Sequence, residues 1–258
     1  MRLSNGYTLW EGPSPEDGAP LALVVTGFRR PSANPKTGPM LQSFVFRTDV
    51  LPSLAVTTGQ DISACNHCPL RQFTVRQASI RDRLPRGQKP TMCYVTTHYS
   101  VDGVYRKYLR GGYPLAKPRQ LARLLKSRLL RLGSYGNPSN VPPAILRELL
   151  RRVQGHTSYD HNWAQPLGRS LKGLAMASVS SPAAKHKAQK MGWKTFRVLR
   201  PGEALEADEV LCQNAVDGTS CYDCLLCDGK TANVAIEDHG PTSRITQEKR
   251  RISLELVI

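Results

Sequence analysis

The chain has 258 residues, of which 40% are hydrophobic. It can therefore bury a core, and this composition excludes a globally disordered protein. Its longest aliphatic run, residues 21–25, is far shorter than the about 20 residues that cross a bilayer. The polar N-terminus has no apolar signal segment, and we therefore expect a soluble, cytoplasmic protein with no membrane partner. The 36 Lys and Arg against 20 Asp and Glu give a net charge of +16, which favours a polyanion such as nucleic acid as partner.

The first 60 residues are predicted to be rich in β-structure. Residues 21–26 and 44–47 have the composition of strands, and Pro, Gly and Asn punctuate residues 30–39 between them. We therefore expect a β-rich segment to precede the first cysteines.

The first cysteine group consists of Cys65, Cys68 and Cys93. Three thiolates leave one coordination position open, and an open position marks a reactive metal centre because a closed set cannot bind substrate. We expect these three cysteines to hold a cofactor. In the alternative interpretation, His67 or His98 supplies a fourth ligand and the group is a closed structural knuckle.

Two helices are predicted in the middle of the chain. Leucines at helical spacing favour a helix over residues 119–132, which Gly133 would end. Pro142 and Pro143 would open a second helix over residues 144–153. The run Gly133-Ser-Tyr-Gly-Asn-Pro between the two helices is typical of a loop.

The same stretch is the most basic part of the chain. Residues 115–152 contain nine Lys or Arg and one acid, Glu148. Three of the cations recur at intervals of four and three residues and would share a helix face that binds nucleic-acid phosphates: Arg119, Arg123 and Lys126. The alternative is an ordinary solvated helix face, and the stretch has no interleaved aromatic residues for base stacking.

A polar and aromatic segment follows at residues 156–163. If the whole segment is a strand, alternation places Tyr159, His161 and Trp163 on one face and Asp160 on the other. The catalytic hypothesis is that three residues form a wall of an active site, namely His156, Tyr159 and His161. The alternative is a polar strand end with a tryptophan in the core.

Residues 174–199 have the pattern of a strand, a helix and a strand. This predicts a βαβ unit with a parallel crossover, and the alternation from about residue 115 to 200 favours an α/β barrel or partial barrel. Ser180 and Ser181 precede a helix rich in cations (Lys185, Lys187 and Lys190). They would cap the helix and offer an anion site at its N-terminus; N-capping alone also explains the serines.

The second cysteine group is predicted to hold a metal centre. Cys221, Cys224 and Cys227 lie within seven residues, with Cys212 just upstream, and an odd total of seven cysteines without a signal segment argues against disulfides. The tight run with one remote cysteine is typical of a ferredoxin-type 4Fe–4S ligand set. Zinc and unmetallated cysteines are the alternatives, and His239 is a candidate ligand or ligand-orienting residue.

Taken in order, these landmarks resemble the phage "gene product 88" family, whose members are similar to radical-SAM barrel proteins. The landmarks are Cys65-Asn-His-Cys-Pro with Cys93-Tyr, Gly133-Ser-Tyr-Gly-Asn-Pro, residues 156–163, Met176-Ala-Ser-Val, the second cysteine group, Val234-Ala-Ile and His239. The resemblance covers roughly residues 65–240. It implies a barrel-like α/β domain, iron–sulfur ligands and a source in a phage or mobile element, hence location in the host cytoplasm.

The chain departs from the pattern in three places. Radical-SAM enzymes typically carry C-x3-C-x2-C in one loop, whereas Cys93 is distant from Cys65 and Cys68, which argues against S-adenosylmethionine cleavage but leaves a three-ligand cluster open. The family tends to have an acid where this chain has Asn137, and a proline where it has Gln213.

The expected fold is therefore an α/β, radical-SAM-like partial barrel. We divide the chain into a β-rich N-terminal segment (1–60), a Cys-containing barrel-like domain (61–200) and a Cys-rich metal-binding segment (201–258). The expected function is that of a phage or mobile-element iron–sulfur protein, with a possible enzymatic role, acting on or beside nucleic acid. The alternative is a non-catalytic nucleic-acid-binding protein in which zinc stabilises the fold.

Overall fold

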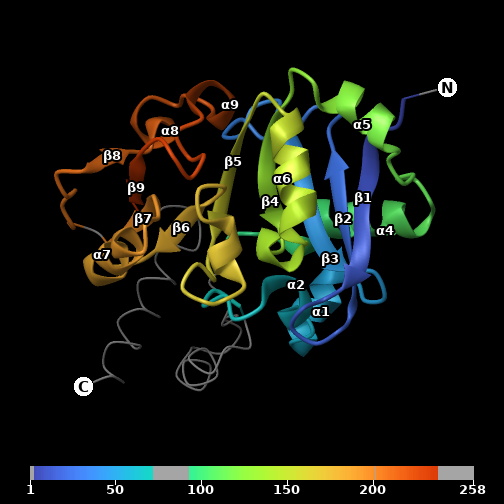
Figure 1. Ribbon diagram of the computed structural model, residues 1–258, viewed down its shortest axis with the longest axis horizontal. Helices are drawn as coiled ribbons and strands as arrows, with labels where there is room; N and C mark the ends of the chain where they lie inside the picture. Colours follow the sequence, from blue (N-terminus) through green and yellow to red (C-terminus); the bar gives the residue numbers. More distant parts are fainter. Residues whose placement is uncertain (1–2, 72–92, 201, 238–258) are drawn as a thin grey trace.

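The structure is a computed structural model that describes residues 3–71, 93–200 and 202–237. One twisted sheet runs through these residues, and helices lie on both of its faces (Figure 1). In the described part the strands are β1 (Gly6–Pro13), β2 (Pro20–Thr26), β3 (Leu41–Arg47), β4 (Leu129–Tyr135), β5 (Gly155–Asp160), β6 (Met176–Val179), β7 (Thr195–Leu199), β8 (Glu209–Leu211) and β9 (Asn233–Glu237).

The strands follow one another across the sheet in chain order up to β7, after which β9 lies between β7 and β8. The first three are antiparallel, and every pairing from β3 onwards is parallel. Successive right-handed crossovers that advance in one direction put their helices on the same face of a sheet. Because the strands are parallel, their carboxyl ends form one edge of the sheet, and α/β proteins bind their ligands at this edge.

The helical segments of the described residues are mostly short. They are α1 (Pro52–Thr58), α2 (Ile62–Cys65), η1 (Thr97–Val101), α4 (Asp102–Leu109), α5 (Pro118–Leu125), η2 (Pro138–Asn140), α6 (Pro143–Arg152), η3 (Gly168–Leu171), α7 (Pro182–Lys190), α8 (Gln213–Val216) and α9 (Cys221–Cys224). Helices α1 and α2, together with the loops that follow β3, lie at the carboxyl edge of the sheet (Figure 1).

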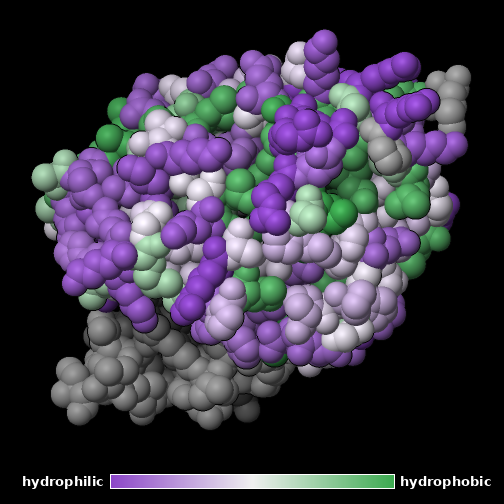
Figure 2. Space-filling view, viewed as in Figure 1, coloured by the Kyte–Doolittle hydropathy of each residue, from purple (hydrophilic) through white to green (hydrophobic). Residues whose placement is uncertain are grey.

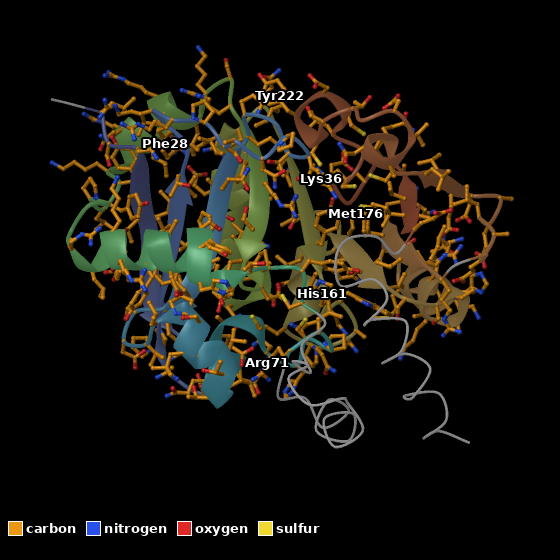
Figure 3. All side chains as sticks on the ribbon, turned by 180° about the vertical axis from the view of Figure 1, so that it is seen from behind. Phe28, Lys36, Arg71, His161, Met176 and Tyr222 are labelled. Atoms are coloured by element: carbon orange, nitrogen blue, oxygen red, sulfur yellow. The ribbon has the colours of Figure 1, made fainter. Side chains whose placement is uncertain are left out.

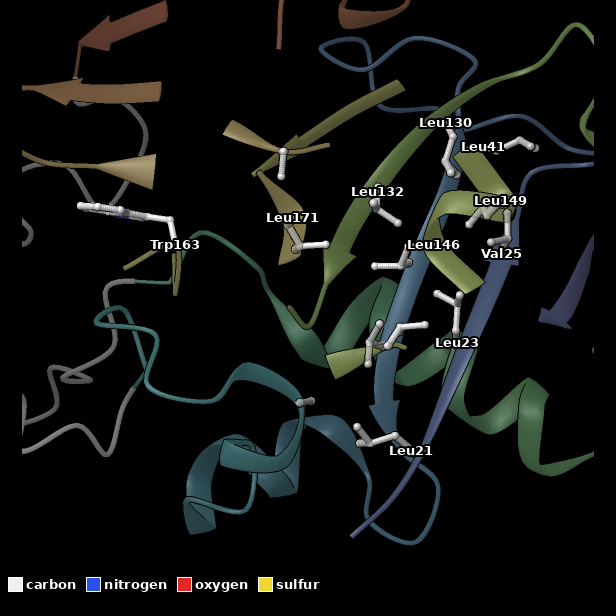
Figure 4. Packing of buried hydrophobic residues seen from close by; sticks show 14 of the residues in the cluster. Leu21, Leu23, Val25, Leu41, Leu130, Leu132, Leu146, Leu149, Trp163 and Leu171 are labelled. Carbon is white, nitrogen blue, oxygen red and sulfur yellow. The ribbon is translucent and has the colours of Figure 1, made fainter. Parts of the chain in front are cut away.

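The main core lies between the sheet and the crossover helices α6 and α7. Leu146 of α6 packs with Leu130 and Leu132 of β4, and Ala188 of α7 belongs to the same cluster (Figure 4). On the opposite face, α4 covers the antiparallel end of the sheet through residues such as Tyr105, which meets Phe46 edge to face. Successive side chains of a strand point to opposite faces of the sheet, so each strand contributes apolar side chains to both cores.

Several predicted elements are confirmed, and two are wrong in part. Strands β2 and β3, helix α6 and the parallel β6–α7–β7 unit stand where the sequence predicted them. The predicted helix over residues 119–132 ends at Leu125, and β4 begins at Leu129. Ser127 has a φ of 59°, which breaks the helix, and a short run of leucines fits a buried parallel strand as well as a helix. Strand β4 also includes Gly133 to Tyr135, which were expected in a loop.

The fold class is thus mixed α/β with a predominantly parallel nine-stranded sheet in the described residues. The three predicted segments all contribute strands to this sheet, because β3 pairs with β4 and β7 pairs with β9. No helix of the described residues is both long and apolar enough to cross a bilayer.

Candidate metal centres

The second cysteine group is anchored to the sheet at both of its ends. Cys212 directly follows β8, and its N–H donates to the carbonyl of Ala235 in β9 at 2.8 Å. Helix α9 carries Cys221 and Cys224, and the carbonyl of Cys227 accepts the N–H of Ser158 in β5 at 3.0 Å. Backbone pairing with two strands therefore sets where the loop and its thiols lie.

The structure brings the four predicted ligands of this group together. Cys212, Cys221, Cys224 and Cys227 all line one small cavity of about 20 Å³, beside Thr157 and Tyr159. Burial raises the pKa of Cys227 to about 12; a hydrogen bond from the Tyr159 hydroxyl opposes the shift, and repulsion from the other three thiolates adds to it. Mutual electrostatic interaction of this kind requires that the four sulfur atoms lie close to one another.

Two further features of this cavity bear on what it can hold. The Thr157 hydroxyl is buried without a hydrogen-bond partner, and such a group is normally satisfied by a ligand or water. The Arg131 guanidinium lies 5.8 Å from the centre of the Tyr159 ring, and its charge lowers the pKa of Cys221 against the effect of burial. The cavity therefore has a cation and two hydroxyl groups beside its four thiols.

Backbone strain occurs in both cysteine loops. Leu225, directly after Cys224, has a left-handed backbone with a φ of 55°, and Asn66, directly after Cys65, has a φ of 50°. Non-glycine residues adopt such angles only where the surroundings enforce them, and such residues cluster at functional sites. In the second cysteine group, the Leu225 side chain lies against Gly155 of β5, where an added Cβ would stand 3.3 Å from it.

The first cysteine group lies at the carboxyl edge of the sheet. Burial, repulsion from Asp61 and repulsion from the thiolates of Cys68 and Cys93 together raise the pKa of Cys65. Burial raises the pKa of Cys68 to about 12, and the charge of Cys93 adds to that shift. Although 24 residues separate Cys68 from Cys93 in sequence, the fold thus brings Cys93 back to the other two.

The two histidines proposed as fourth ligands lie on the surface. His67 is exposed, and its Nε2 is 3.0 Å from Oε1 of Glu16. The ring of His98 stacks on Tyr99 with their centres 4.4 Å apart. Both rings have a neighbour other than the thiols.

Buried polar side chains from the ends of β4 and β5 hold the first cysteine loop in place. The Asn140 side chain donates to the carbonyl of Ala64 at 2.7 Å, and the Asn162 side chain donates to the carbonyl of Cys65 at 3.1 Å. Arg71 donates to the carbonyl of Asn66 at 3.1 Å and pairs with Asp61. These bonds fix the backbone on both sides of Cys65.

Asn137, the position where the resembled family tends to have an acid, contacts a buried carboxylate. Its Nδ2 donates to Oδ1 of Asp160 at 2.8 Å, and burial raises the pKa of Asp160 although this hydrogen bond opposes the shift. An acid at position 137 would face Asp160, and two carboxylates so close cannot both ionise. The amide is therefore matched to Asp160 in this chain.

Replacing Asn137 by aspartate is expected to destabilise the protein by about 1–3 kcal/mol at neutral pH, because Asp160 loses a donor and gains a like charge. The pKa of Asp160 is already raised from 3.8. The loss of stability caused by Asn137→Asp should therefore be largest at neutral pH, where both carboxyls would ionise, and should become smaller as the pH falls towards 3.8. Thermal unfolding of both proteins at several pH values measures it. Asn34→Asp, on an exposed loop, is the control; equal pH dependence of the two variants would contradict the expectation.

The three residues of the catalytic hypothesis do not share one surface. Tyr159 lies with the second cysteine group, whereas His156 points to the opposite face of β5, where its Nε2 is 2.8 Å from the carbonyl of Leu174. His161 lies beyond the end of β5, near the first cysteine loop, and burial lowers its pKa to about 4 (Figure 3). The alternation predicted through residue 163 is wrong past Asp160, because the chain turns there and the N–H of Asn162 donates to the Asp160 side chain.

The two cysteine groups lie in different parts of the molecule, although Cys212 also follows the carboxyl end of a parallel strand, β8. Lys36 and Tyr222, which flank the second group, are at one end of the molecule, and Arg71 and His161 are at the other (Figure 3). The carbonyl of Lys36 accepts the N–H of Cys221 at 2.8 Å. In the described residues, no three His, Cys, Asp or Glu side chains are placed to hold a single metal ion. His239 lies outside the described residues.

The predicted cationic helix face is present only in part. Arg119 and Arg123 are exposed on α5, and Leu125 is buried in the core. Lys126 is exposed too, but it follows the last helical residue and has an extended backbone, with a ψ of 131°. Arg119 and Arg123 therefore share one face of α5, whereas Lys126 lies just beyond its carboxyl end.

Sequence reasoning did not identify Arg131, Asp160 or Arg71 as parts of these sites. Arg131 was assigned to a helix, so nothing indicated that it would lie beside Cys221 of α9. Asp160 had a usable signal, since a buried acid at the end of a parallel strand lies on the ligand-binding edge. Arg71 follows Cys68 by three residues without a recognisable motif.

The fold and the cysteines define a mixed α/β protein with four thiols around one cavity and three more at the carboxyl edge of the sheet. Comparison with known proteins finds no matching family model, no matching curated protein and no matching solved structure. The resemblance to the "gene product 88" family therefore remains a prediction based on the order of the sequence landmarks.

Proposed function

We propose that the protein is an iron–sulfur protein whose second cysteine group holds a 4Fe–4S cluster. The observation that carries this proposal is the convergence of Cys212, Cys221, Cys224 and Cys227 on one cavity. Four cysteine thiolates are the usual ligand set of such clusters. The unpartnered hydroxyl of Thr157 gives the cavity a free donor for a cluster sulfide.

The spacing of the cysteines along the chain supports a cluster rather than zinc, because Cys221-x2-Cys224-x2-Cys227 with one remote cysteine is the ferredoxin-type pattern. A zinc ion needs all four thiolates about 2.3 Å from one point. In a cubane each thiolate binds a different iron atom, so the sulfurs stay further apart. The cavity of about 20 Å³ is smaller than a cluster; rotation of the half-buried Cys221 and Cys224 side chains would enlarge it.

Residues beside the cavity would tune such a cluster. A bound cluster supplies one-electron transfer, with a potential set by nearby charge, hydrogen bonds to sulfur and solvent exposure. The Tyr159 hydroxyl donates to the Cys227 sulfur, and the Arg131 charge acts on Cys221. Both favour the more negative, reduced state.

We further propose that Cys65, Cys68 and Cys93 hold a second centre with an open coordination position. Its place at the carboxyl edge of the parallel strands supports this role, because α/β proteins bind their ligands there. The strand order, sequential from β1 to β7, supports the proposal of a radical-SAM-like partial barrel. The buried bonds that fix the Cys65 loop would keep its thiols in position.

Anaerobic purification followed by iron, sulfide and zinc analysis tests the proposal. One cluster gives about four iron and four sulfide per chain, and two clusters give about eight of each. Brown protein with these contents supports the iron–sulfur assignment. Colourless protein with stoichiometric zinc would favour the alternative, and protein that takes up neither metal would overturn both.

Nucleic acid is the partner that we propose for the basic surface of α5. The exposed cations Arg119, Arg123 and Lys126 support this, together with the net charge of +16. Glu148, the one acid of the stretch, is engaged by Arg151 and Arg152. The cations of α5 therefore keep their charge for an external anion.

Neutralising Arg119, Arg123 and Lys126 together to glutamine is expected to weaken binding to nucleic acid and reduce its salt dependence. Each lost phosphate contact lowers the slope of log K against log salt by about 0.9 on duplex DNA. The fold should persist, since exposed charges contribute little to stability. Binding of a labelled duplex at several salt concentrations measures the slope.

The control for that variant neutralises three exposed cations elsewhere, Arg169, Lys187 and Lys190. It should retain most of the binding. If the wild-type protein binds no nucleic acid at low salt, or if both variants behave alike, the α5 surface is an ordinary solvated face.

A further inference from the structure

A cavity of about 320 Å³ lies near the amino end of the parallel strands, beside the start of β1. Five residues line it: Ser4, Asn5, Arg29, Arg30 and Lys107. Three of the five are cations and none is an acid, so the cavity has a positive potential. Neither cysteine group contributes a residue to it.

Asn5 holds the two arginines in place. Its Oδ1 accepts the N–H of Arg29 at 3.1 Å and the N–H of Arg30 at 2.7 Å. Its backbone carbonyl accepts the N–H groups of Gly27 and Phe28, and Gly27 allows this turn because its φ is 103°. Asn5 thus accepts the N–H groups of four successive residues. The side chains of Arg29 and Arg30 both extend from this turn at the rim of the cavity.

The three cations are not neutralised from within the described residues. No described acid forms an ion pair with Arg29, Arg30 or Lys107. Lys107 is held by its Nζ, which lies 5.0 Å from the centre of the Tyr113 ring, a contact that positions the charge without cancelling it. Arg29 and Arg30 are exposed, so they can reach an external anion.

The cavity adjoins the basic surface of α5. Gln120 of α5 donates to the hydroxyl of Tyr7, which also accepts the N–H of Ser4 at the cavity wall. Arg128 reaches the carbonyl of Phe28, next to Arg29, at 3.4 Å. Phe28 lies at the same end of the sheet as α5 (Figure 3), and hydrophilic side chains cover this end of the molecule (Figure 2).

We propose that this cavity binds a phosphate group of a nucleic-acid backbone that continues onto α5. Paired arginines suit the oxygens of phosphate, because the guanidinium fork donates two parallel hydrogen bonds. A volume of about 320 Å³ is at the small end of ligand sites and suits one phosphate with part of its nucleotide. The choice of nucleic acid over a free phosphate compound rests on the function proposed for α5; the phosphate site itself does not.

The test compares the variant Arg29→Gln/Arg30→Gln with wild type in two assays. The first is fluorescence anisotropy with a labelled oligonucleotide, single-stranded and duplex. The second is thermal unfolding with added pyrophosphate, which stabilises a protein that binds it in the folded state. We expect oligonucleotide binding to weaken about tenfold, because two charge-assisted hydrogen bonds are lost, and the stabilisation by pyrophosphate to disappear.

The control Arg169→Gln/Lys187→Gln removes the same charge from exposed positions outside the cavity. It should behave like wild type in both assays, and all three proteins should unfold alike without ligand. If only the response to pyrophosphate is lost, the phosphate site stands and nucleic acid is the wrong source. If the cavity variant matches the control in both assays, the cavity binds no phosphate, and the proposal for α5 is then judged by its own variant.

Discussion

Replacing Cys224 by serine is expected to remove the iron and sulfide of the second cysteine group from the purified protein. Cys224 is one of four thiols around a single cavity, and a cluster that loses one ligand is exposed to solvent and released. Because metal binding is coupled to folding of the loops that supply the ligands, α8, α9 and the turn at Leu225 should also lose stability. Iron analysis and thermal unfolding of the anaerobically purified protein measure both effects.

Tyr222→Phe is the matched control for this substitution. Tyr222 is 38% exposed in the same helix, and removing its hydroxyl leaves all four thiols in place. The control should keep its metal and its unfolding temperature. A Cys224→Ser protein with unchanged iron and unchanged unfolding would remove the second cysteine group from the list of metal sites. Cys65→Ser should leave this group loaded, because the first group lies in a different part of the molecule.

Replacing Glu209 by glutamine is expected to lower the free energy of unfolding by about 3 kcal/mol. Arg197 of β7 and Glu209 of β8 are both fully buried and form a bidentate pair, with Nε of Arg197 2.7 Å from Oε1. Removing one charge of such a pair leaves the other without its partner in a low-dielectric interior. Glu203, which also pairs with Arg197, limits the loss.

This loss corresponds to a fall in the unfolding temperature of about 6–12 °C for a chain of this size. Glu148→Gln, which breaks an exposed pair on α6, is the control and should change stability little. Equal unfolding temperatures for the two variants would show that the buried pair does not stabilise β7 and β8. Since Cys212 follows β8 directly, Glu209→Gln should also weaken retention of metal by the second group.

Lys185 belongs to the same buried network, so its charge is not available to the anion site expected at the N-terminus of α7. The sequence places it on a cation-rich helix after Ser181, which does cap the helix as predicted by accepting the N–H of Ala184. The Lys185 side chain, however, is 1% exposed and pairs with Glu206 and Asp208. The acids lie 20 or more residues further along the chain, so local spacing could not reveal that this charge is already paired.

Local signals were sufficient for the strands and helices whose residues agree with one conformation. Prolines at the first turn identified α6, and a serine cap followed by proline identified α7. The strand β4 was missed because leucines at 129, 130 and 132 fit either conformation, and burial on both faces of a parallel sheet settles the choice. Such burial depends on β3 and β5, which are remote in sequence.

By itself, the sequence determined the α/β class and the grouping of Cys212, Cys221, Cys224 and Cys227, because three of these thiols are held within seven residues by short covalent spacing. Only the tertiary structure decided that Cys93 returns to Cys65 and Cys68, that His156 and Tyr159 face opposite sides of one strand, and that Arg29, Arg30 and Lys107 enclose a cavity. The reason is physical: spacing along the chain constrains neighbours within a few residues, whereas contacts between distant segments depend on which strands pair and which faces are buried.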